Sequence, residues 1–242
     1  MTEQADLTPV ARHPRTIRSF VKRGGRIPPG AQKALNAAWE HYGLALDSYD
    51  VNTPVLNFDK LFAKVNPVIL EVGFGMGHSL LAMAKANPDM NYLGVEVHEP
   101  GIARIIKSAA ELGLTNLKIA RVDAVWLLQK VVLPQSLFGV QIFFPDPWHK
   151  KRHEKRRLIN AEFITLLNSR LVKKGWVHIA TDWVPYAEQV QQLFEEAAET
   201  FQAILPGLQG LLPDKGERLL TKFERRGLRL GHEVRDLCYQ KL

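Results

Sequence analysis

Short apolar segments and amphipathic segments alternate along most of this chain. From about residue 66 onward, apolar runs of strand length are each followed by a segment with helical periodicity. The expected strands are residues 68–72, 92–97, 117–122, 140–144 and 176–180, and the expected helices are residues 78–86, 102–112, 124–131, 158–171 and 185–200. Strands that alternate with helices in this way form a parallel sheet with helices on both faces. The sequence therefore predicts an α/β fold with an open, mostly parallel, doubly wound sheet.

The two ends of the chain depart from this alternation. Residues 1–50 include a long stretch that has arginine and lysine but no acidic residue, and we interpret them as a basic N-terminal arm with a short helix over residues 31–42. The arm is either a solvated tail or a segment that becomes ordered on nucleic acid. Residues 51–242 form the main domain. Within it, residues 201–216 are expected to be an irregular connection and residues 237–239 a last strand.

Charge and cysteine content narrow the classes of protein. The chain has 242 residues, a net charge of +7 and a single cysteine, Cys238. A moderately basic chain suits a polyanionic partner, and one cysteine excludes an intrachain disulfide and suits a reducing compartment. The longest uncharged stretch, residues 131–145, is too short and too polar to span a bilayer, and no segment has the character of a secretory signal. We therefore expect a cytoplasmic protein that does not bind a membrane.

The most informative segment runs from Phe143 to His153. It starts at the end of an apolar strand, and Asp146 follows between two prolines, which bias the backbone of this acid toward an extended turn. Trp148 and a dense cluster of basic residues come next. Because open α/β sheets bind their ligands outside the carboxyl ends of strands, the segment places a carboxylate, an aromatic ring and a phosphate-binding cluster at one strand end. It predicts an active site for a polyanion, most simply a nucleic acid.

A glycine-rich turn follows the first predicted strand. Glu71 precedes three alternating glycines, Gly73, Gly75 and Gly77, which let the backbone approach a ligand closely. A dinucleotide fingerprint needs G-x-G-x-x-G/A, but the third position here is histidine. The spacing instead resembles the first motif of class I methyltransferases, which bind S-adenosylmethionine. That cofactor lacks a pyrophosphate and carries an ammonium and a sulfonium group, so nearby acids suit it; a tight turn without a ligand is the alternative.

Acidic residues also follow the later predicted strands. Glu96 ends the second strand, where it can accept hydrogen bonds from ribose hydroxyls. Asp123 ends the third strand, where it can face the adenine edge or act as a helix N-cap. Taken singly, each acid is as well explained by a solvated turn or a cap, but their recurrence at successive strand ends favours cofactor binding. Asp182 ends the fifth strand on the same sheet edge as Asp146, with helix capping as its alternative role.

The strongest run of positive charge follows the predicted active-site turn. It consists of Lys150, Lys151, Arg152, Lys155, Arg156 and Arg157. Such a run is usually a solvated helix face, but its place beside the predicted site favours phosphate binding. His149 and His153 have the i, i+4 spacing of zinc ligands, yet the surrounding cations disfavour a dication. We therefore expect no metal site.

Together these segments resemble the bacterial tRNA (guanine-N7-)-methyltransferases over roughly residues 50–242. The resemblance rests on the glycine turn, the strand Leu93–His98, the segment Phe143–Lys150, the segment Ala180–Trp183, and Thr221-Lys222-Phe223-Glu224, which also has the spacing of a capping box. It implies a class I methyltransferase fold. The implied reaction is transfer of a methyl group from S-adenosylmethionine to N7 of the guanine at position 46, in the variable loop of tRNA.

The resemblance also implies roles for individual residues. The cofactor contacts it implies are Glu71, Glu96, Asp123 and Asp146, and Asp146 is also the implied catalytic residue. The substrate contacts it implies are Lys150, Asp182, Thr221, Lys222, Phe223 and Glu224, together with an RNA-contacting segment over residues 152–157. Nothing specific to the family is found in the N-terminal arm.

Three alternatives stay open on the sequence alone. A nicotinamide-dependent oxidoreductase is disfavoured by the glycine spacing and the basic cluster. An RNA-binding protein with a vestigial cofactor site is disfavoured by the retained glycines and acids. A methyltransferase of exocyclic amines is the nearest rival, because a polar residue before proline also holds amino targets. The ring of Trp148 faces either an exposed base or the core, and no pattern indicates an oligomeric state.

Overall fold

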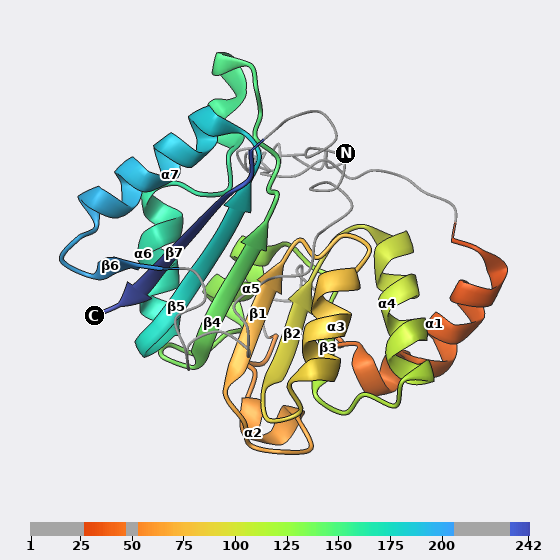
Figure 1. The fold of residues 1–242 in the computed structure, drawn as a ribbon. Helices are drawn as coiled ribbons and strands as arrows, with labels where there is room; N and C mark the ends of the chain where they lie inside the picture. The colour runs from red at the N-terminus through yellow and green to blue at the C-terminus, as the bar shows by residue number, and fades with distance from the viewer. Residues whose placement is uncertain (1–26, 47–52, 206–232) are drawn as a thin grey trace, which may run out of the picture.

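The computed structural model of the protein describes residues 27–46, 53–205 and 233–242. A seven-stranded sheet with the order β3-β2-β1-β4-β5-β7-β6 forms its centre (Figure 1). The strands are β1 Val68–Val72, β2 Asn91–Val95, β3 Leu117–Ala120, β4 Leu137–Phe143, β5 Leu171–Thr181, β6 Phe201–Ile204 and β7 Arg235–Lys241. Strands β1 to β5 are parallel, and β7 is antiparallel to both of its neighbours. The predicted α/β class and mostly parallel sheet are confirmed.

Helices cover both faces of this sheet. They are α1 Pro29–Tyr42, α2 Phe58–Leu61, α3 His78–Ala86, α4 Glu99–Glu111, α5 Ala124–Lys130, α6 Ala161–Arg170 and α7 Val184–Glu196, with a 3₁₀ helix η1 at Lys151–Arg156. One core contains Leu80 of α3 and Ile106 of α4, and the other contains Phe163 of α6 and Val190 of α7. In Figure 1, α3 and α4 lie in front of the sheet and α5 and α6 behind it.

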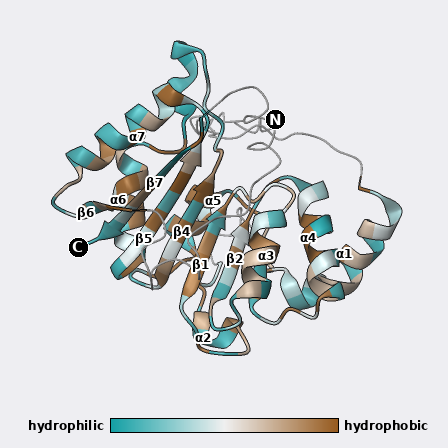
Figure 2. Ribbon diagram, viewed as in Figure 1, coloured by the Kyte–Doolittle hydropathy of each residue, from teal (hydrophilic) through white to brown (hydrophobic). Residues whose placement is uncertain are grey.

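The central strands β1 and β4 are apolar nearly throughout because they are buried on both faces of the sheet. All five residues of β1 are buried, and Figure 2 shows hydrophobic colour along β1, β4 and β5. Alternate residues of such a strand point to opposite faces, so a continuous apolar run supplies both cores. The sheet therefore gives a rigid base from which the loops at its carboxyl edge project.

Helix α1 packs on this domain rather than standing apart from it. The Tyr42 hydroxyl donates a hydrogen bond to the Ala109 carbonyl of α4 at 3.0 Å. Gly43 forms a parallel bridge with Ile119 of β3, and Leu44 is buried in the core. The division drawn at residue 50 from the sequence therefore separates residues that the structure packs together.

The C-terminal strands complete one edge of the sheet. Residues 201–204, expected to belong to an irregular connection, form β6, so this part of the expectation is wrong. The reason is long-range packing: the Phe194 ring of α7 stacks 3.7 Å from Tyr239 of β7 and meets Phe201 of β6 edge-on at 5.2 Å, centroid to centroid. Strand β7 lies between β5 and β6. Residues 206–216 lie outside the described residues.

Two further observations concern membranes and metals. Within the described ranges, no helix combines the length and the apolar character needed to cross a bilayer. In the same part of the chain, no three His, Cys, Asp or Glu side chains gather as they do around a metal ion. The two histidines with zinc-ligand spacing contact different rings: His149 lies 4.4 Å from Trp183, and His153 lies 6.0 Å from Trp148, centroid to centroid.

Candidate active site

A cavity of about 430 Å³ opens at the carboxyl ends of strands β1 to β5. It lies where the strand order reverses, between β1 and β4, which is where open α/β sheets bind ligands. The predicted site residues that line it are Gly73, Gly75, Glu96, Asp123, Asp146 and Asp182. These residues come from loops far apart in the sequence, and the sheet brings them to one place. The volume is in the range of small-molecule sites, roughly 300–1,000 Å³.

The glycine turn between β1 and α3 forms one wall. Gly73, Gly75 and Gly77 have φ angles of +71°, +56° and +71°, a region that residues with a side chain rarely adopt. No atom lies within 4 Å of the place where a Cβ of Gly73 or Gly75 would stand. The turn therefore leaves open space beside its backbone for ligand atoms. A Cβ at Gly77 would lie 2.6 Å from Cδ1 of Ile105, so this third glycine allows α3 and α4 to pack.

Gly101 of α4 supports the glycine turn from outside the cavity. It is buried, and a Cβ at this position would lie 1.9 Å from the carbonyl oxygen of Gly75. The Arg104 guanidinium, one turn further along α4, donates a hydrogen bond to the Met76 carbonyl at 2.7 Å. The start of α4 thus fixes the turn by close backbone contact. Sequence reasoning missed this residue, because a glycine beside a predicted helix start is too common to indicate a role.

Glu96 holds the two loops of this wall together. Its carboxylate accepts hydrogen bonds from the backbone N–H groups of Gly75 at 2.8 Å, Val97 at 2.6 Å and His98 at 3.0 Å. An ionised carboxylate has about four acceptor sites, so about one remains for a ligand hydroxyl. Glu96 therefore shapes the cavity as well as lining it.

Glu71 occupies a different position from the other predicted acids. Its side chain is buried in β1 and is not among the residues that line the cavity. Burial, with a smaller contribution from the nearby charge of Glu96, raises the pKa of Glu71 to about 8. Gln141 of β4 lies beside it in the sheet register. The structure therefore favours a neutral Glu71 at pH 7, and the predicted cofactor contact stays a prediction.

Asp123 serves both of the roles that the sequence left open. Its Oδ1 accepts a hydrogen bond from the Trp126 backbone N–H at 2.8 Å, so it is the N-cap of α5. The same residue lines the cavity. Capping fixes the carboxylate at the start of the helix, and it leaves acceptor sites for a ligand on the cavity side.

Asp146 and Asp182 approach the cavity from the ends of β4 and β5. Asp146 lies on a turn in which Phe144 and Trp148 have φ angles of +53° and +47°. Positive φ in such bulky residues costs on the order of 1–3 kcal/mol each and is concentrated at functional sites. The Phe144 backbone N–H donates to the Ala180 carbonyl at 2.8 Å, which fixes the turn to β5. Two carboxylates thus face one cavity from adjacent strands.

The basic run lies beside this turn, on and around η1. Lys150, Lys151, Arg152 and Lys155 are exposed. The Arg156 guanidinium lies 3.7 Å from the centre of the Trp148 ring. Trp148 is half-buried, so this ring belongs to the surface beside η1 rather than to the core. Most of the run therefore presents positive charge to solvent next to the cavity.

Arg157 departs from its neighbours in this run. Its side chain is 4% exposed, and its Nε donates a hydrogen bond to the Pro147 carbonyl at 2.8 Å. A guanidinium that is buried in this way and already donates to protein acceptors is poorly placed to contact phosphates of RNA. This burial disfavours the predicted contact of Arg157 with substrate, which stays a prediction. A charge run in the sequence does not show which of its members point inward. The predicted contacts Thr221, Lys222, Phe223 and Glu224, and residues 1–26 of the arm, lie outside the described residues.

Known proteins that are similar in sequence to this chain are methyltransferases, as the predicted cofactor site implies. A family model described as "putative methyltransferase" matches residues 65–237. A tRNA (guanine-N(7)-)-methyltransferase of Hydrogenovibrio crunogenus is 43% identical over 99% of this chain and 97% of its own length. A relative of the same name from Sodalis glossinidius is 46% identical over 94% of this chain and 92% of its own length. The chain belongs to the tRNA (guanine-N(7)-)-methyltransferase family. The predicted family, enzyme class and methyl donor, S-adenosylmethionine, are confirmed.

A solved structure supports the fold alone. The 16S rRNA methyltransferase KamB is 16% identical, the match covers 76% of this chain and 92% of the KamB chain, and the two superimpose with a TM-score of 0.53.

Membership of the tRNA (guanine-N(7)-)-methyltransferase family excludes the nicotinamide-dependent oxidoreductase and disfavours the exocyclic-amine enzyme. The glycines and acids that this family member retains around its cavity argue against a vestigial cofactor site.

Proposed function

We propose that this family member methylates N7 of the guanine in the variable loop of tRNA, at position 46, and that Asp146 is the carboxylate that faces the base. The observation that carries the proposal is that Asp146 and Asp182 line the same cavity as the glycine turn. The position within tRNA rests on the resemblance of the motifs. We infer a cytoplasmic location from a tRNA substrate and the single cysteine.

The cavity fits S-adenosylmethionine in its shape and its charge. The open space at Gly73 and Gly75 admits a ligand against the backbone, and Glu96 and Asp123 supply acceptors for its sugar and base. When bound, the cofactor supplies a methyl carbon that is activated by the adjacent sulfonium. The retained acids stabilise its positive groups, and an ammonium near Glu71 would favour the ionised form of that buried carboxyl.

Guanine N7 has a lone pair and no proton, so the protein needs no base to activate it. What the site must supply is position and a field that stabilises the positive charge that develops on the ring. Asp146 is the first candidate for this role because its backbone is held by two prolines and the positive-φ turn. The Asp146 carboxylate can also accept hydrogen bonds from the N1–H and amino groups of guanine, and Asp182 is the second acid.

The exposed cations around η1 give the substrate its electrostatic contact. Lys150, Lys151, Arg152 and Lys155 are exposed beside the turn that carries Asp146. Neutralising phosphates with such residues releases counterions and makes the affinity for RNA fall with salt. We infer that this surface holds the phosphates that flank the target guanine.

The test is methyl transfer to two matched tRNA transcripts, one with guanine and one with adenine at position 46. Both are incubated with the protein and labelled S-adenosylmethionine, and N7-methylguanine is located by chemical cleavage of the chain. We expect label and cleavage only in the first transcript, at position 46. Equal labelling of both transcripts would show that the position is wrong, and label without cleavage would show that N7 is not the target.

A further inference from the structure

Arg157 is the one member of the basic run Lys150–Arg157 that the structure buries. Its side chain is 4% exposed, whereas its near neighbour Arg152 is exposed. Burying a guanidinium is costly unless its N–H groups find partners. The groups that pair with the Arg157 guanidinium therefore indicate its role.

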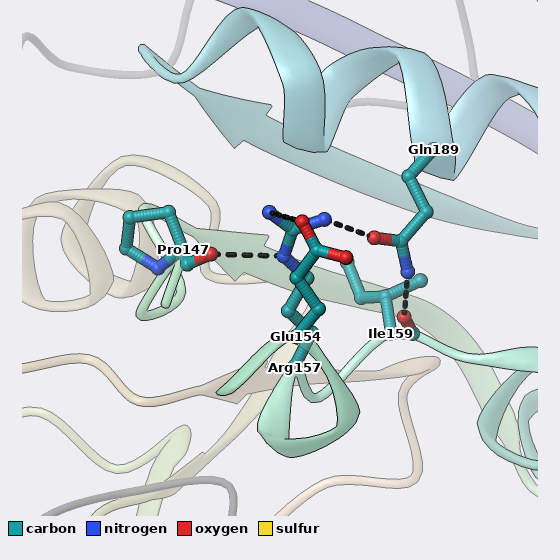
Figure 3. Close-up of polar contacts among 5 residues, drawn as sticks. All are labelled: Pro147, Glu154, Arg157, Ile159 and Gln189. Atoms are coloured by element: carbon teal, nitrogen blue, oxygen red, sulfur yellow. Dashed lines mark hydrogen bonds and ion pairs between the residues drawn. The ribbon is translucent and has the colours of Figure 1, made fainter. Parts of the chain in front are cut away.

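Three different segments of the chain supply those partners. Nε donates to the Pro147 carbonyl at 2.8 Å, and one terminal nitrogen lies 3.4 Å from Oε1 of Glu154 in η1 (Figure 3). The other terminal nitrogen donates to Oε1 of Gln189 in α7. The guanidinium also lies over the Tyr186 ring of α7, 5.0 Å from its centre. Arg157 thus connects three segments: the turn after β4 that carries Asp146, the 3₁₀ helix η1, and helix α7.

The α7 side of this junction is itself fixed. The Gln189 amide donates to the Ile159 carbonyl at 3.4 Å (Figure 3). The Tyr186 hydroxyl accepts a hydrogen bond from the Ile159 backbone N–H at 3.1 Å. Tyr186 is fully buried in the core. The guanidinium therefore holds the loop that follows β4 in a fixed position relative to helix α7.

The contact of Arg157 with Pro147 fixes the turn that carries Asp146. Its carbonyl belongs to the residue directly after Asp146, and the ring of Pro147 limits the freedom of the backbone between them. Phe144 is held to β5 on the other side of Asp146 by the hydrogen bond to Ala180. The turn that carries the carboxylate is consequently fixed at both ends, by the sheet before it and by Arg157 after it.

We propose that Arg157 is a positioning residue for Asp146 and not a contact for RNA phosphates. The proposal rests on the function proposed above, in which the Asp146 carboxylate acts on the guanine. Loss of the guanidinium frees the end of the turn, and a misplacement of about 1 Å in a catalytic group lowers the rate by about 10²-fold. Lysine keeps the charge but cannot donate in the three directions of the fork.

The decisive variant is therefore Arg157→Lys, with Arg152→Ala as the matched removal of an exposed cation. Three quantities are measured for each: the salt dependence of tRNA binding, the affinity for S-adenosylmethionine, and the single-turnover rate of methyl transfer at saturating tRNA and cofactor. For Arg157→Lys we expect the rate to fall about 10–100-fold, while the salt slope and the affinity for S-adenosylmethionine stay unchanged. For Arg152→Ala we expect the salt slope to fall by about one.

A second variant covers the case in which Arg157→Lys does not fold. Gln189→Ala leaves every charge in place and removes one acceptor of the guanidinium. Like Arg157→Lys, it should therefore lower the single-turnover rate without changing the salt slope of tRNA binding. A merely structural role would lower the unfolding temperature and leave the rate at saturation, measured well below that temperature, unaltered.

The outcomes separate the two proposals. Methyl transfer by the unmodified protein tests the proposed function by itself, because it does not depend on Arg157. An Arg157→Lys rate within about threefold of the parent overturns the positioning role. An Arg157→Lys variant that folds but binds tRNA with a reduced salt slope would also overturn it, and would assign the residue to the phosphate surface.

Discussion

The substitution Gly101→Ala tests how the glycine turn that forms one wall of the cavity is held in place. A Cβ at Gly101 would stand 1.9 Å from the Gly75 carbonyl oxygen, whereas an ordinary C···O contact is about 3.3 Å. The glycine turn must therefore recede by about 1.4 Å, or α4 must move by as much. Overpacking of this size costs about 1–3 kcal/mol.

The expected result depends on whether the glycine turn or helix α4 moves to accommodate the added methyl group. Gly75 belongs to an open turn, whereas α4 is packed against the sheet through Ile102 and Ile106. The turn should move, its hydrogen bond to Glu96 should be disturbed, and S-adenosylmethionine should bind about 10–100-fold more weakly, since about 1.4 kcal/mol corresponds to a factor of ten.

Calorimetric titration with S-adenosylmethionine is the assay, and urea denaturation checks the fold. Gly30→Ala is the matched control, because a Cβ at Gly30 has no atom within 4 Å, and it should leave the affinity unchanged. A folded Gly101→Ala protein with a dissociation constant within about twofold of the parent would refute the reasoning, because the turn would then not depend on α4.

Three further predictions concern chemistry, RNA and pH. Asp146→Asn keeps the shape of the turn and removes its charge, so single-turnover transfer should fall at least about 10²-fold with tRNA still bound; a rate within about threefold would make Asp182 the leading carboxylate. Replacing Arg152 and Arg156 by alanine should weaken tRNA binding and reduce the salt slope by about one for each phosphate that is no longer neutralised, with cofactor affinity unchanged; an unaltered slope would move the RNA surface elsewhere. The pKa of Glu71 is raised from 4.5 to about 8 by burial, so the folded state holds a proton that the unfolded state loses between these values, and unfolding free energy falls as pH rises through this window. Urea denaturation of Glu71→Gln should show the variant gaining on the parent by up to about 1.4 kcal/mol per pH unit from about pH 4.5 to 8, whereas a constant difference would mean that folding does not shift the pKa of Glu71.

The elements and most of the cavity were predictable because they depend on local signals. Apolar runs identify buried strands, and parallel strands place their carboxyl ends at one edge, so Glu96, Asp123, Asp146 and Asp182 were expected to lie together. What the sequence could not show is which members of a pattern face inward. Arg157 looks like its neighbours in a charge run, although only its environment on α7 makes it a buried partner of Pro147.

The same limit applies to the edge of the sheet and to the glycines. Gln202 and Ala203 do not indicate a strand by their residue types, and they form part of one because β7 pairs with them. Gly101 is required by the carbonyl oxygen of Gly75, which lies far earlier in the chain. Such requirements come from contacts between distant segments, and no periodicity along the chain records them.

The position of β7 has a consequence for the order of assembly. β6 is made about thirty residues before β7, yet among the described residues its neighbour in the sheet is β7, so this pairing cannot form until residues 235–241 have been added. Until then the edge of β5 that pairs with β7 lacks that strand, and an unpaired strand edge is the kind of surface that pairs with other chains. During synthesis on the ribosome, strands β1 to β5, whose carboxyl ends form the cavity, can come together first. Strand β7 then pairs with both β5 and β6. Truncation before residue 235 should therefore yield a protein that aggregates even though its cavity residues are all present.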